Sequence, residues 1–362
     1  MRRASSSASM VGVATMIVTL LFAGSHLAQN DWNPTIFTAF GEGDQGIREY
    51  AEARLENVIL RPHLGHDGRF FFVQGNDPWL VDPDENASVL DRPTYRSQRM
   101  LYPMLASAGG LLGPEGVTWG MVVVNVLAMA GGAMAAAAIA IRLGGSAWWG
   151  LSFPLNIGLI SEFSVGGAGI VAAAAAFGAI LYLMDRRLAI ATVLIVASVL
   201  SREVMVVTAI GGAGYLFFKG ERRPAMIFAT TPVLAAALWA LFLRARLPAD
   251  GDVVAGNLGV PFAGFLENLP NWIEDPIELA VGLVTVLVLV FLSIRAIRSP
   301  SLLAWGFALF APLAFLLTGP VWDGYFNISR AVAPVYTAYI LLAFAARAET
   351  SPGEVEPARV AL

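Results

Sequence analysis

The chain has 362 residues, of which 57% are hydrophobic and only 14% are charged, and its formal net charge is −4. Its mean hydropathy of +0.65 excludes an ordinary soluble domain and predicts an all-α protein that crosses a membrane several times. The slightly negative charge does not imply nucleic acid as a partner, and the absence of cysteine excludes disulfides and thiolate metal sites.

The first apolar run, 9–28, follows the basic residues Arg2 and Arg3. It predicts an uncleaved signal-anchor helix with a cytoplasmic N-terminus, because the rest of the chain also spans repeatedly. A cleaved signal peptide that ends near Ala28 is the alternative. Residues 29–116 then form the one long hydrophilic loop, where a membrane enzyme could meet a soluble or lipid-linked substrate.

Ten transmembrane helices are predicted from the lengths of the apolar runs. A hydrocarbon core of about 30 Å needs about 20 helical residues. Two of the runs are too long for one crossing and too short for two full ones, and we expect them to break at 161–163 (SEF) and 201–203 (SRE). The predicted spans lie near 9–28, 117–141, 147–160, 164–184, 188–200, 204–218, 225–243, 277–294, 301–318 and 331–346.

Residues 101–113 are the main ambiguity, because so short an apolar segment could span or could lie in the outer leaflet as a juxtamembrane helix. The positive-inside rule favours the second. The cytoplasmic loops then hold Arg142, Arg186, Arg187, Lys219, Arg222, Arg223, Arg295, Arg298 and Arg347, against Arg202, Arg244, Arg246 and Arg330 outside. Both termini are then cytoplasmic, 1–346 forms a single transmembrane domain, and 347–362 is expected to be a disordered cytoplasmic tail.

In this topology, the unusual polar residues converge on the extracytoplasmic side. They are the loop 29–116, Glu162, Arg202 with Glu203, the loop 244–276 and the segment 322–330. Charged side chains at membrane depth are costly and usually line a cavity or a pathway. The predicted helix 188–200 covers only roughly 20 Å, so Arg202 and Glu203 are expected to lie below the outer surface, in a polar cavity.

Several short motifs stand in these outer segments. They are HDGRFFF at 66–72, DP at 77–78, YRSQRMLYP at 95–103, SRE at 201–203, and NISR at 327–330 with Pro334. Together they resemble the GT-C superfamily of polytopic glycosyltransferases that use polyprenyl-phosphate sugars. The nearest likeness is to a bacterial branch of cell-surface glycopolymer proteins, whose first loop reads roughly YDGQFYY, DP and YRYQRILYP. The likeness spans most of the chain, although only the first-loop pattern is specific.

The resemblance implies a GT-C-like bundle of about ten helices, whose long first extracytoplasmic loop carries juxtamembrane helices. It also implies a hexosyl or pentosyl transferase in a bacterial cytoplasmic membrane. No cofactor is expected. Its partners would be a polyprenyl-phosphate sugar donor, a cell-envelope glycan or glycolipid acceptor, and membrane lipids. The departures of this chain from the pattern include His66 for Tyr, Arg69 for Gln and Phe72 for Tyr. The aromatic changes remove hydroxyls and Arg69 adds a charge, so substrate choice or activity could differ.

The chemistry can also be argued from the residues. Transfer of a sugar from a lipid phosphate to a hydroxyl needs a carboxylate to take the acceptor's proton, and cations to hold the departing phosphate. Asp67 is the candidate base, and the resemblance places the superfamily's loop acid there. Asp44 is its rival, and either aspartate could instead belong to a turn. Glu162 matches the second outer-loop acid of the superfamily by topology, with a solvated loop glutamate as the alternative.

Arginine suits a phosphate because its planar fork donates two parallel, charge-assisted hydrogen bonds. The candidates for the phosphate are Arg96, Arg99, Arg202 and Arg330. Each could instead close a structural ion pair, for example Arg202 with Glu162. Further substrate contacts are expected from His66, Arg69, Tyr95, Tyr102 and Glu203.

Metal binding is not expected. The acidic cluster Asp82, Asp84, Glu85 and Asp91 lacks the glycine placement and the terminal glutamate of a calcium loop. His63 and His66 have no third nearby ligand to complete a zinc site. Two other functions remain open: a transporter or flippase of lipid-linked sugars, against which the absence of an apparent internal repeat speaks, and a non-catalytic envelope-assembly or lipid-binding subunit.

Overall fold

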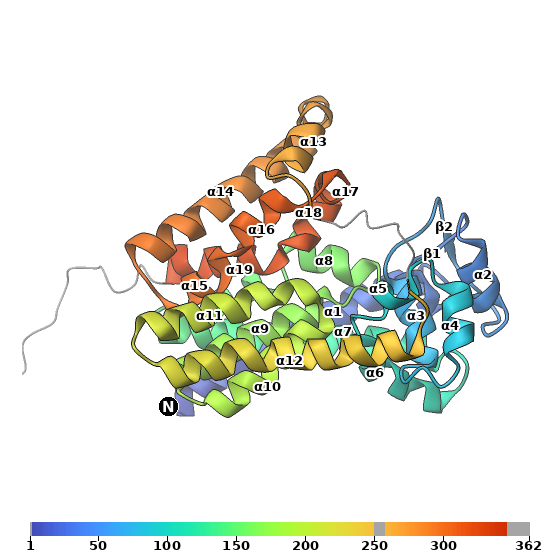
Figure 1. Cartoon of the computed structure of the whole chain (residues 1–362), viewed down its shortest axis with the longest axis horizontal. Helices are drawn as coiled ribbons and strands as arrows, with labels where there is room; N and C mark the ends of the chain where they lie inside the picture. The colour runs from blue at the N-terminus through green and yellow to red at the C-terminus, as the bar shows by residue number, and fades with distance from the viewer. Residues whose placement is uncertain (1, 250–257, 346–362) are drawn as a thin grey trace, which may run out of the picture.

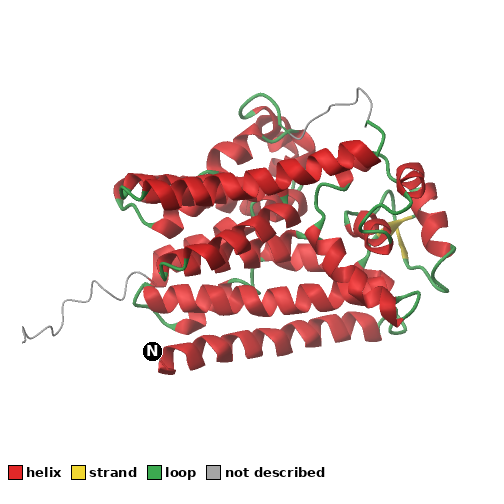
Figure 2. Ribbon diagram, turned by 60° about the horizontal axis from the view of Figure 1, so that its bottom comes forward, coloured by secondary structure: helices red, strands yellow, loops and turns green. Residues whose placement is uncertain are grey.

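The computed structural model describes residues 2–249 and 258–345, and this part of the chain is mostly helical (Figures 1 and 2). Its one sheet is a parallel pair of two-residue strands, β1 (Phe40–Gly41) and β2 (Leu60–Arg61). The prediction of an all-α protein is therefore confirmed. The predicted tail 347–362 and residues 250–257 of the loop 244–276 lie outside the described residues.

In the described part of the chain, four helices are long and apolar enough to cross a membrane: α1 (Arg2–Ala28), α7 (Gly116–Arg142), α12 (Arg222–Arg246) and α14 (Pro276–Arg298). Shorter apolar helices pack among them. These are α9 (Gly169–Met184), α10 (Leu188–Ser201), α11 (Val206–Phe218) after the 3-10 turn η4 (Glu203–Met205), the pair α15 (Leu302–Ala308) and α16 (Phe310–Leu316), and α19 (Ala333–Phe344). Helices of this length and composition are compatible with a membrane-embedded protein.

Short helices of the first loop gather at one end of the bundle (Figure 1, right). They are η1 (Pro34–Phe37), α2 (Gln45–Glu52), α3 (Gly68–Asn76), α4 (Pro83–Val89), α5 (Pro93–Arg96), α6 (Leu101–Ser107) and η2 (Ala108–Leu112). Their core is a separate aromatic cluster around Phe40, Phe72 and Tyr102, and it packs on α7 through Val117 and Met121. Burial of these rings anchors the loop on the bundle.

Residues 101–112 form one short apolar helical segment. α6 passes directly into the 3-10 helix η2, and both pack against α7. Glycine permits this contact, because a Cβ on Gly120 would lie 2.1 Å from the carbonyl oxygen of Ala106. The segment therefore forms a hairpin with α7 at the loop end of the bundle.

Two boundaries differ from the predicted spans. The segment 147–160 begins as the 3-10 helix η3 (Ala147–Ser152), and α8 (Ile157–Ser164) continues past the expected break. The break falls at 165–168. Gly166 allows it, because this residue has φ +60° and lies so close to the carbonyl oxygen of Phe37 that a Cβ would clash with it. Glu162 is thus a helical residue rather than a loop residue. The predicted span 301–318 is divided at Leu309 into α15 and α16.

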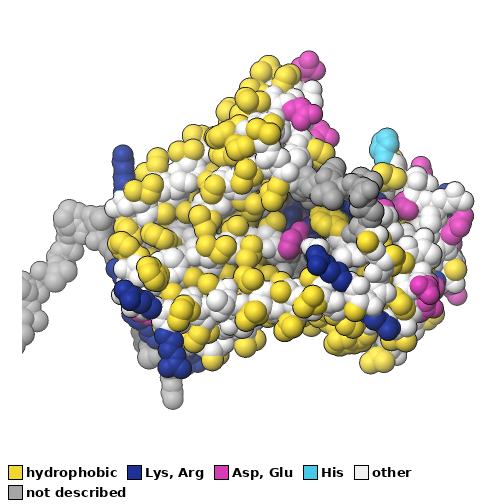
Figure 3. Space-filling view, in the orientation of Figure 1, with side chains coloured by type: hydrophobic (Ala, Val, Ile, Leu, Met, Phe, Trp, Pro, Cys, Tyr) yellow, Lys and Arg dark blue, Asp and Glu magenta, His cyan; other side chains and the backbone are white. Residues whose placement is uncertain are grey.

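Acidic side chains gather toward one end of the bundle, whereas basic side chains stand at both (Figure 3). The turns between α9 and α10, α11 and α12, and α14 and α15 lie with the start of α1 at the left end of Figure 1, opposite the loop helices. In Figure 3, Lys and Arg side chains stand at this end and also on the loop side of the molecule, and apolar side chains cover the flank. Asp and Glu side chains stand at the loop end and near α13 (Ala263–Glu274). The remaining helices, α17 (Gly319–Trp322) and α18 (Tyr325–Ala331), lie between α16 and α19.

Candidate active site

A cavity of about 770 Å³ lies where the first loop meets the bundle. Nine of the predicted site residues line it: His66, Asp67, Arg69, Tyr95, Arg96, Arg99, Arg202, Glu203 and Arg330. An apolar wall from η4, α11, α16 and α17 completes it, with Val204, Val206, Val207, Leu313, Leu317 and Val321. The cavity therefore joins a charged region to a surface that suits a hydrocarbon chain.

Asp67 lies among three arginines. Its Oδ2 is 3.1 Å from Nη2 of Arg330 and 3.5 Å from Nη1 of Arg99, and its Oδ1 is 3.9 Å from Nη1 of Arg96. The carboxylate keeps 29% of its side-chain surface exposed. Burial acts to raise the pKa of Asp67, but the positive charges of Arg330, Arg99 and Arg96 outweigh it and hold that pKa well below its usual range.

A backbone contact puts Asp67 in this position. Asp67 occupies the N-cap position of α3, yet its side chain makes no capping hydrogen bond and is left for the arginines. The backbone N–H of Gly68 donates to the carbonyl oxygen of Val165, at 3.1 Å. A Cβ on Gly68 would lie 2.3 Å from that oxygen, so the approach of the loop to the α8–α9 turn requires glycine.

Glu162 lies behind the cavity wall and is 2% exposed. Its Oε1 is 2.8 Å from Nη1 of Arg202 and 3.2 Å from Nε of Arg330, while its Oε2 accepts from the backbone N–H of Gly169. The ion pair considered for Arg202 is therefore present. Because Arg330 also contacts Asp67, Glu162 and Asp67 are connected through one guanidinium group.

Other carboxylates pair with the remaining predicted arginines. Arg99 forms a two-fold hydrogen bond with Glu203, with both distances 2.9 Å. Arg96 forms one with Asp91, with both distances 2.8 Å. Such pairs fix the planes of the guanidinium groups. Nε of Arg202, in contrast, is buried and has no hydrogen-bond partner among the described residues.

Asp44 and Tyr102 do not line the cavity. Asp44 is the N-cap of α2, where its side chain accepts from the N–H of Ile47, and it also pairs with Arg69 at 2.8 Å. Tyr102 has no exposed surface, and its hydroxyl donates to the carbonyl oxygen of Met121. The geometry gives both residues contacts that hold the first loop together.

Three of the first-loop acids considered as a calcium loop bind separate partners in the structure. Asp82 caps α4 by accepting from the N–H of Glu85 at 3.2 Å, Glu85 pairs with Arg54, and Asp91 pairs with Arg96. Within 2–249 and 258–345, no group of three His, Asp or Glu side chains could hold a metal ion.

Sequence reasoning missed several residues that shape the site. Asp91 stands in the acidic cluster of the sequence, and nothing in its five-residue spacing from Arg96 predicts the ion pair that they form. Gln74 and Trp239 donate to the carbonyl oxygens of Arg96 and Ser97. Neither residue carries a motif, since their roles depend on which backbone atoms lie opposite them.

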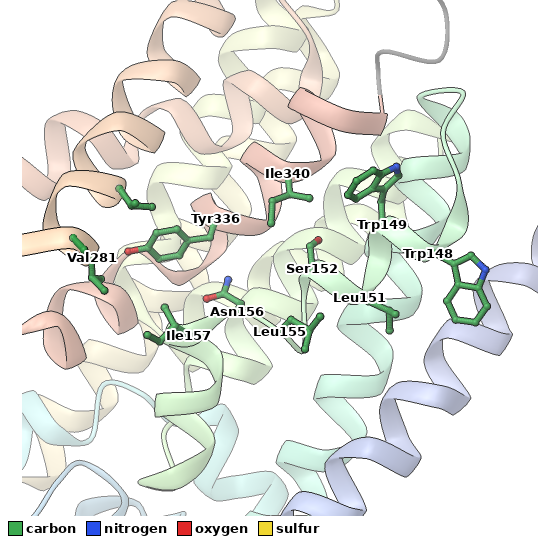
Figure 4. Close-up of a pocket in the computed structure, with 12 residues that line it drawn as sticks. Trp148, Trp149, Leu151, Ser152, Leu155, Asn156, Ile157, Val281, Tyr336 and Ile340 are labelled. Carbon is green, nitrogen blue, oxygen red and sulfur yellow. The ribbon is translucent and has the colours of Figure 1, made fainter. Parts of the chain in front are cut away.

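A second cavity of about 610 Å³ lies between η3, α8, α14 and α19 (Figure 4). Trp148, Trp149 and Leu155 line it together with Tyr336, and no charged side chain does. The Tyr336 hydroxyl lies 2.6 Å from Oγ1 of Thr285. This cavity therefore offers a ligand neither a carboxylate nor a cation.

Comparison with known proteins found no counterpart: no family model, no curated protein and no solved structure matches the chain. The chemistry of the site can be argued from its own side chains. A carboxylate can take a proton, a group of arginines can hold an anion, and an apolar wall can bind a hydrocarbon chain. This combination suits an amphiphilic ligand with an anionic head group.

Proposed function

We propose that this protein is a glycosyltransferase that moves a sugar from a polyprenyl-phosphate donor to a cell-envelope glycan or glycolipid acceptor. The observation that carries the proposal is the meeting of Asp67, Arg99, Arg202 and Arg330 in one cavity with an apolar wall. The arginines would hold the phosphate, and the wall would hold the first part of the prenyl chain. The resemblance of the first-loop motifs to GT-C enzymes supports the same reaction.

In the proposed reaction, Asp67 takes the proton of an acceptor hydroxyl. The hydroxyl oxygen forms a bond to the anomeric carbon of the sugar, and the bond from that carbon to the phosphate oxygen breaks with its electron pair. The lipid phosphate departs with one more negative charge. Arginines aimed at that oxygen stabilise the charge as it develops.

Arg202 is the first choice for the phosphate contact. Its Nη1 binds Glu162 and the carbonyl oxygen of Arg330, while its buried Nε retains an unused hydrogen-bond donor. Arg99 and Arg330 line the same cavity, and both contact Asp67. A bound phosphate and the carboxylates would compete for these arginines. Because all of these groups lie at the same cavity, an arginine could change partner by movement of its side chain alone.

The proposal includes the membrane topology. Ten segments would cross a bacterial cytoplasmic membrane, formed by α1, α7, η3 with α8, α9, α10, α11, α12, α14, α15 with α16, and α19. Lys and Arg at the end where α1 begins would face the cytoplasm, as the positive-inside rule requires. The cavity would then open on the extracytoplasmic side, and both termini would be cytoplasmic.

The Asp67→Asn variant tests the proposed reaction. Loss of a general base typically costs about 10²- to 10⁴-fold in rate, so transfer from a polyprenyl-phosphate sugar to extracted envelope glycolipids should fall by that factor. Asp84→Asn is the matched control, since Asp84 is an exposed first-loop acid outside the cavity. Unfolding temperatures establish that both variants fold. Full activity of folded Asp67→Asn would remove Asp67 as the base.

A further inference from the structure

The segment 91–99, which we call the arginine arm, carries two of the three arginines that contact Asp67. The side chains of Arg96 and Arg99 line the cavity, and each is also paired with a carboxylate. Its backbone is held from two helices. Nε2 of Gln74 in α3 donates to the carbonyl oxygen of Arg96 at 2.9 Å, and Nε1 of Trp239 in α12 donates to that of Ser97 at 2.8 Å.

Trp239 belongs to α12, a helix that is mostly exposed: only 17% of the residues in its apolar stretch are buried. Near its C-terminal end, however, α12 meets the first loop beside α5 (Figure 1). There Leu243 and Leu247 pack on Leu80, and Trp239 stacks on Phe242 with 4.9 Å between ring centroids. This end of α12 is therefore attached to the loop by a small apolar cluster and by the indole hydrogen bond.

We propose that Trp239 is a positioning residue for the donor phosphate, and that it acts by fixing the arginine arm. The inference rests on the proposed function. Arg96 directly precedes Ser97 and Arg99 follows two residues later, so movement of the Ser97 carbonyl would shift both guanidinium groups. Displacement of a binding group by about 1 Å is enough to weaken a preorganised site. Trp239 lines neither cavity, so its effect on the ligand would be indirect.

The test compares Trp239→Phe with Trp305→Phe. Trp305 also donates its indole N–H to a backbone carbonyl, that of Ala296 at 3.1 Å, and it stacks on Phe218, but it does not line the cavity. Both changes remove one such hydrogen bond and keep an aromatic ring. Binding of undecaprenyl phosphate to the purified full-length protein in phosphatidylcholine nanodiscs is measured for each variant.

A hydrogen bond of ordinary strength corresponds to about a 3- to 10-fold change in an equilibrium constant. Trp239→Phe should raise the Kd by about that factor, while Trp305→Phe leaves it unchanged. In transfer assays, Trp239→Phe should lower kcat/KM for the donor by a similar factor, with part of the loss in kcat, because the arm arginines would also stabilise the charge that develops on the departing phosphate. In an Arg96→Gln/Arg99→Gln background, Trp239→Phe should have no further effect.

The outcomes separate this inference from the proposed function. If the wild-type protein binds undecaprenyl phosphate and Trp239→Phe binds it equally well, the positioning role is wrong and the proposed function stands. An equal loss of affinity in Trp305→Phe would also overturn the positioning role, because the effect would then be general destabilisation. If the wild-type protein does not bind the lipid phosphate, the proposed function and this inference both fail.

Discussion

Three guanidinium groups lie within 4 Å of Asp67, and they determine what this carboxylate can do. They keep it ionised, as a base must be, but a carboxylate with so low a pKa attracts a proton weakly. A phosphate that draws Arg99 and Arg330 toward itself would weaken their electrostatic attraction to the Asp67 carboxylate. The acid would then become a stronger base when the donor is bound.

The same charges predict how stability depends on pH. Because the folded-state pKa of Asp67 lies below its ordinary value of 3.8, its ionised form stabilises the fold at neutral pH, and this stabilisation is lost as the pH falls below about 4. Wild-type protein should therefore unfold at a higher temperature than Asp67→Asn at pH 7, and the difference should shrink toward pH 3. A difference that stays constant over this range would contradict the assignment.

Gly68 determines where Asp67 lies. A Cβ added to Gly68 would lie 2.3 Å from the carbonyl oxygen of Val165 and 2.6 Å from that of Thr38. Both are backbone atoms, which cannot rotate away as a side chain could. Gly68→Ala should lower the free energy of unfolding by about 1–3 kcal/mol, the usual cost of overpacking, and should impair transfer.

The control for this prediction is Gly131→Ala in the interior of α7. Nothing lies within 4 Å of a Cβ there, so the change should be neutral or slightly stabilising. Thermal unfolding followed by tryptophan fluorescence measures both variants. Equal stability of Gly68→Ala and wild type would show that the loop does not need this close approach.

At the scale of elements, the site depends on the turn between α8 and α9. Glu162 in the last turn of α8 binds Arg202 after α10 and Arg330 in α18, and it also accepts from the start of α9. One buried carboxylate thus connects four helices. Its partners lie 40 and 168 positions away along the chain; the sequence offered the pair with Arg202 only as an alternative, and nothing along the chain indicated the contact with Arg330.

Glu162→Gln should be strongly destabilising. Removal of one member of a buried ion pair typically costs about 3–5 kcal/mol, because the partner charge is left uncompensated. Glu221→Gln breaks the more exposed pair with Arg186 and should cost about 0–1 kcal/mol. Denaturant titration in detergent micelles compares the two variants. Similar losses in both would mean that Glu162 does not hold these helices together.

At the scale of the whole molecule, the proposed orientation can be tested directly because the chain has no cysteine. Single cysteines at the exposed positions Asp84, in α4, and Arg223, at the start of α12, lie at opposite ends of the bundle. In intact cells, a membrane-impermeant maleimide should label Asp84→Cys. It should label Arg223→Cys only after permeabilisation, since basic turns remain cytoplasmic. The reverse pattern would invert the topology.

The apolar runs by themselves determined the helical character of the molecule. A hydrophobic segment bounded by polar residues is a local property of the chain, and α1, α7, α12 and α14 follow the predicted segments within a few residues at their C-terminal ends. The first-loop motifs likewise indicated Asp67, Arg96 and Arg99 as members of one site, because these residues lie within a short stretch of sequence.

Tertiary structure alone decided which distant groups complete that site. Arg330 reaches Asp67 across 263 positions, Glu162 lies buried in a helix instead of exposed in a loop, and Tyr102 packs under the loop away from the cavity. Trp239 and the apolar wall were not indicated by any motif. The physical reason is that helix formation depends on neighbours along the chain, whereas the meeting of charges depends on how the helices pack and on where glycine allows a close approach.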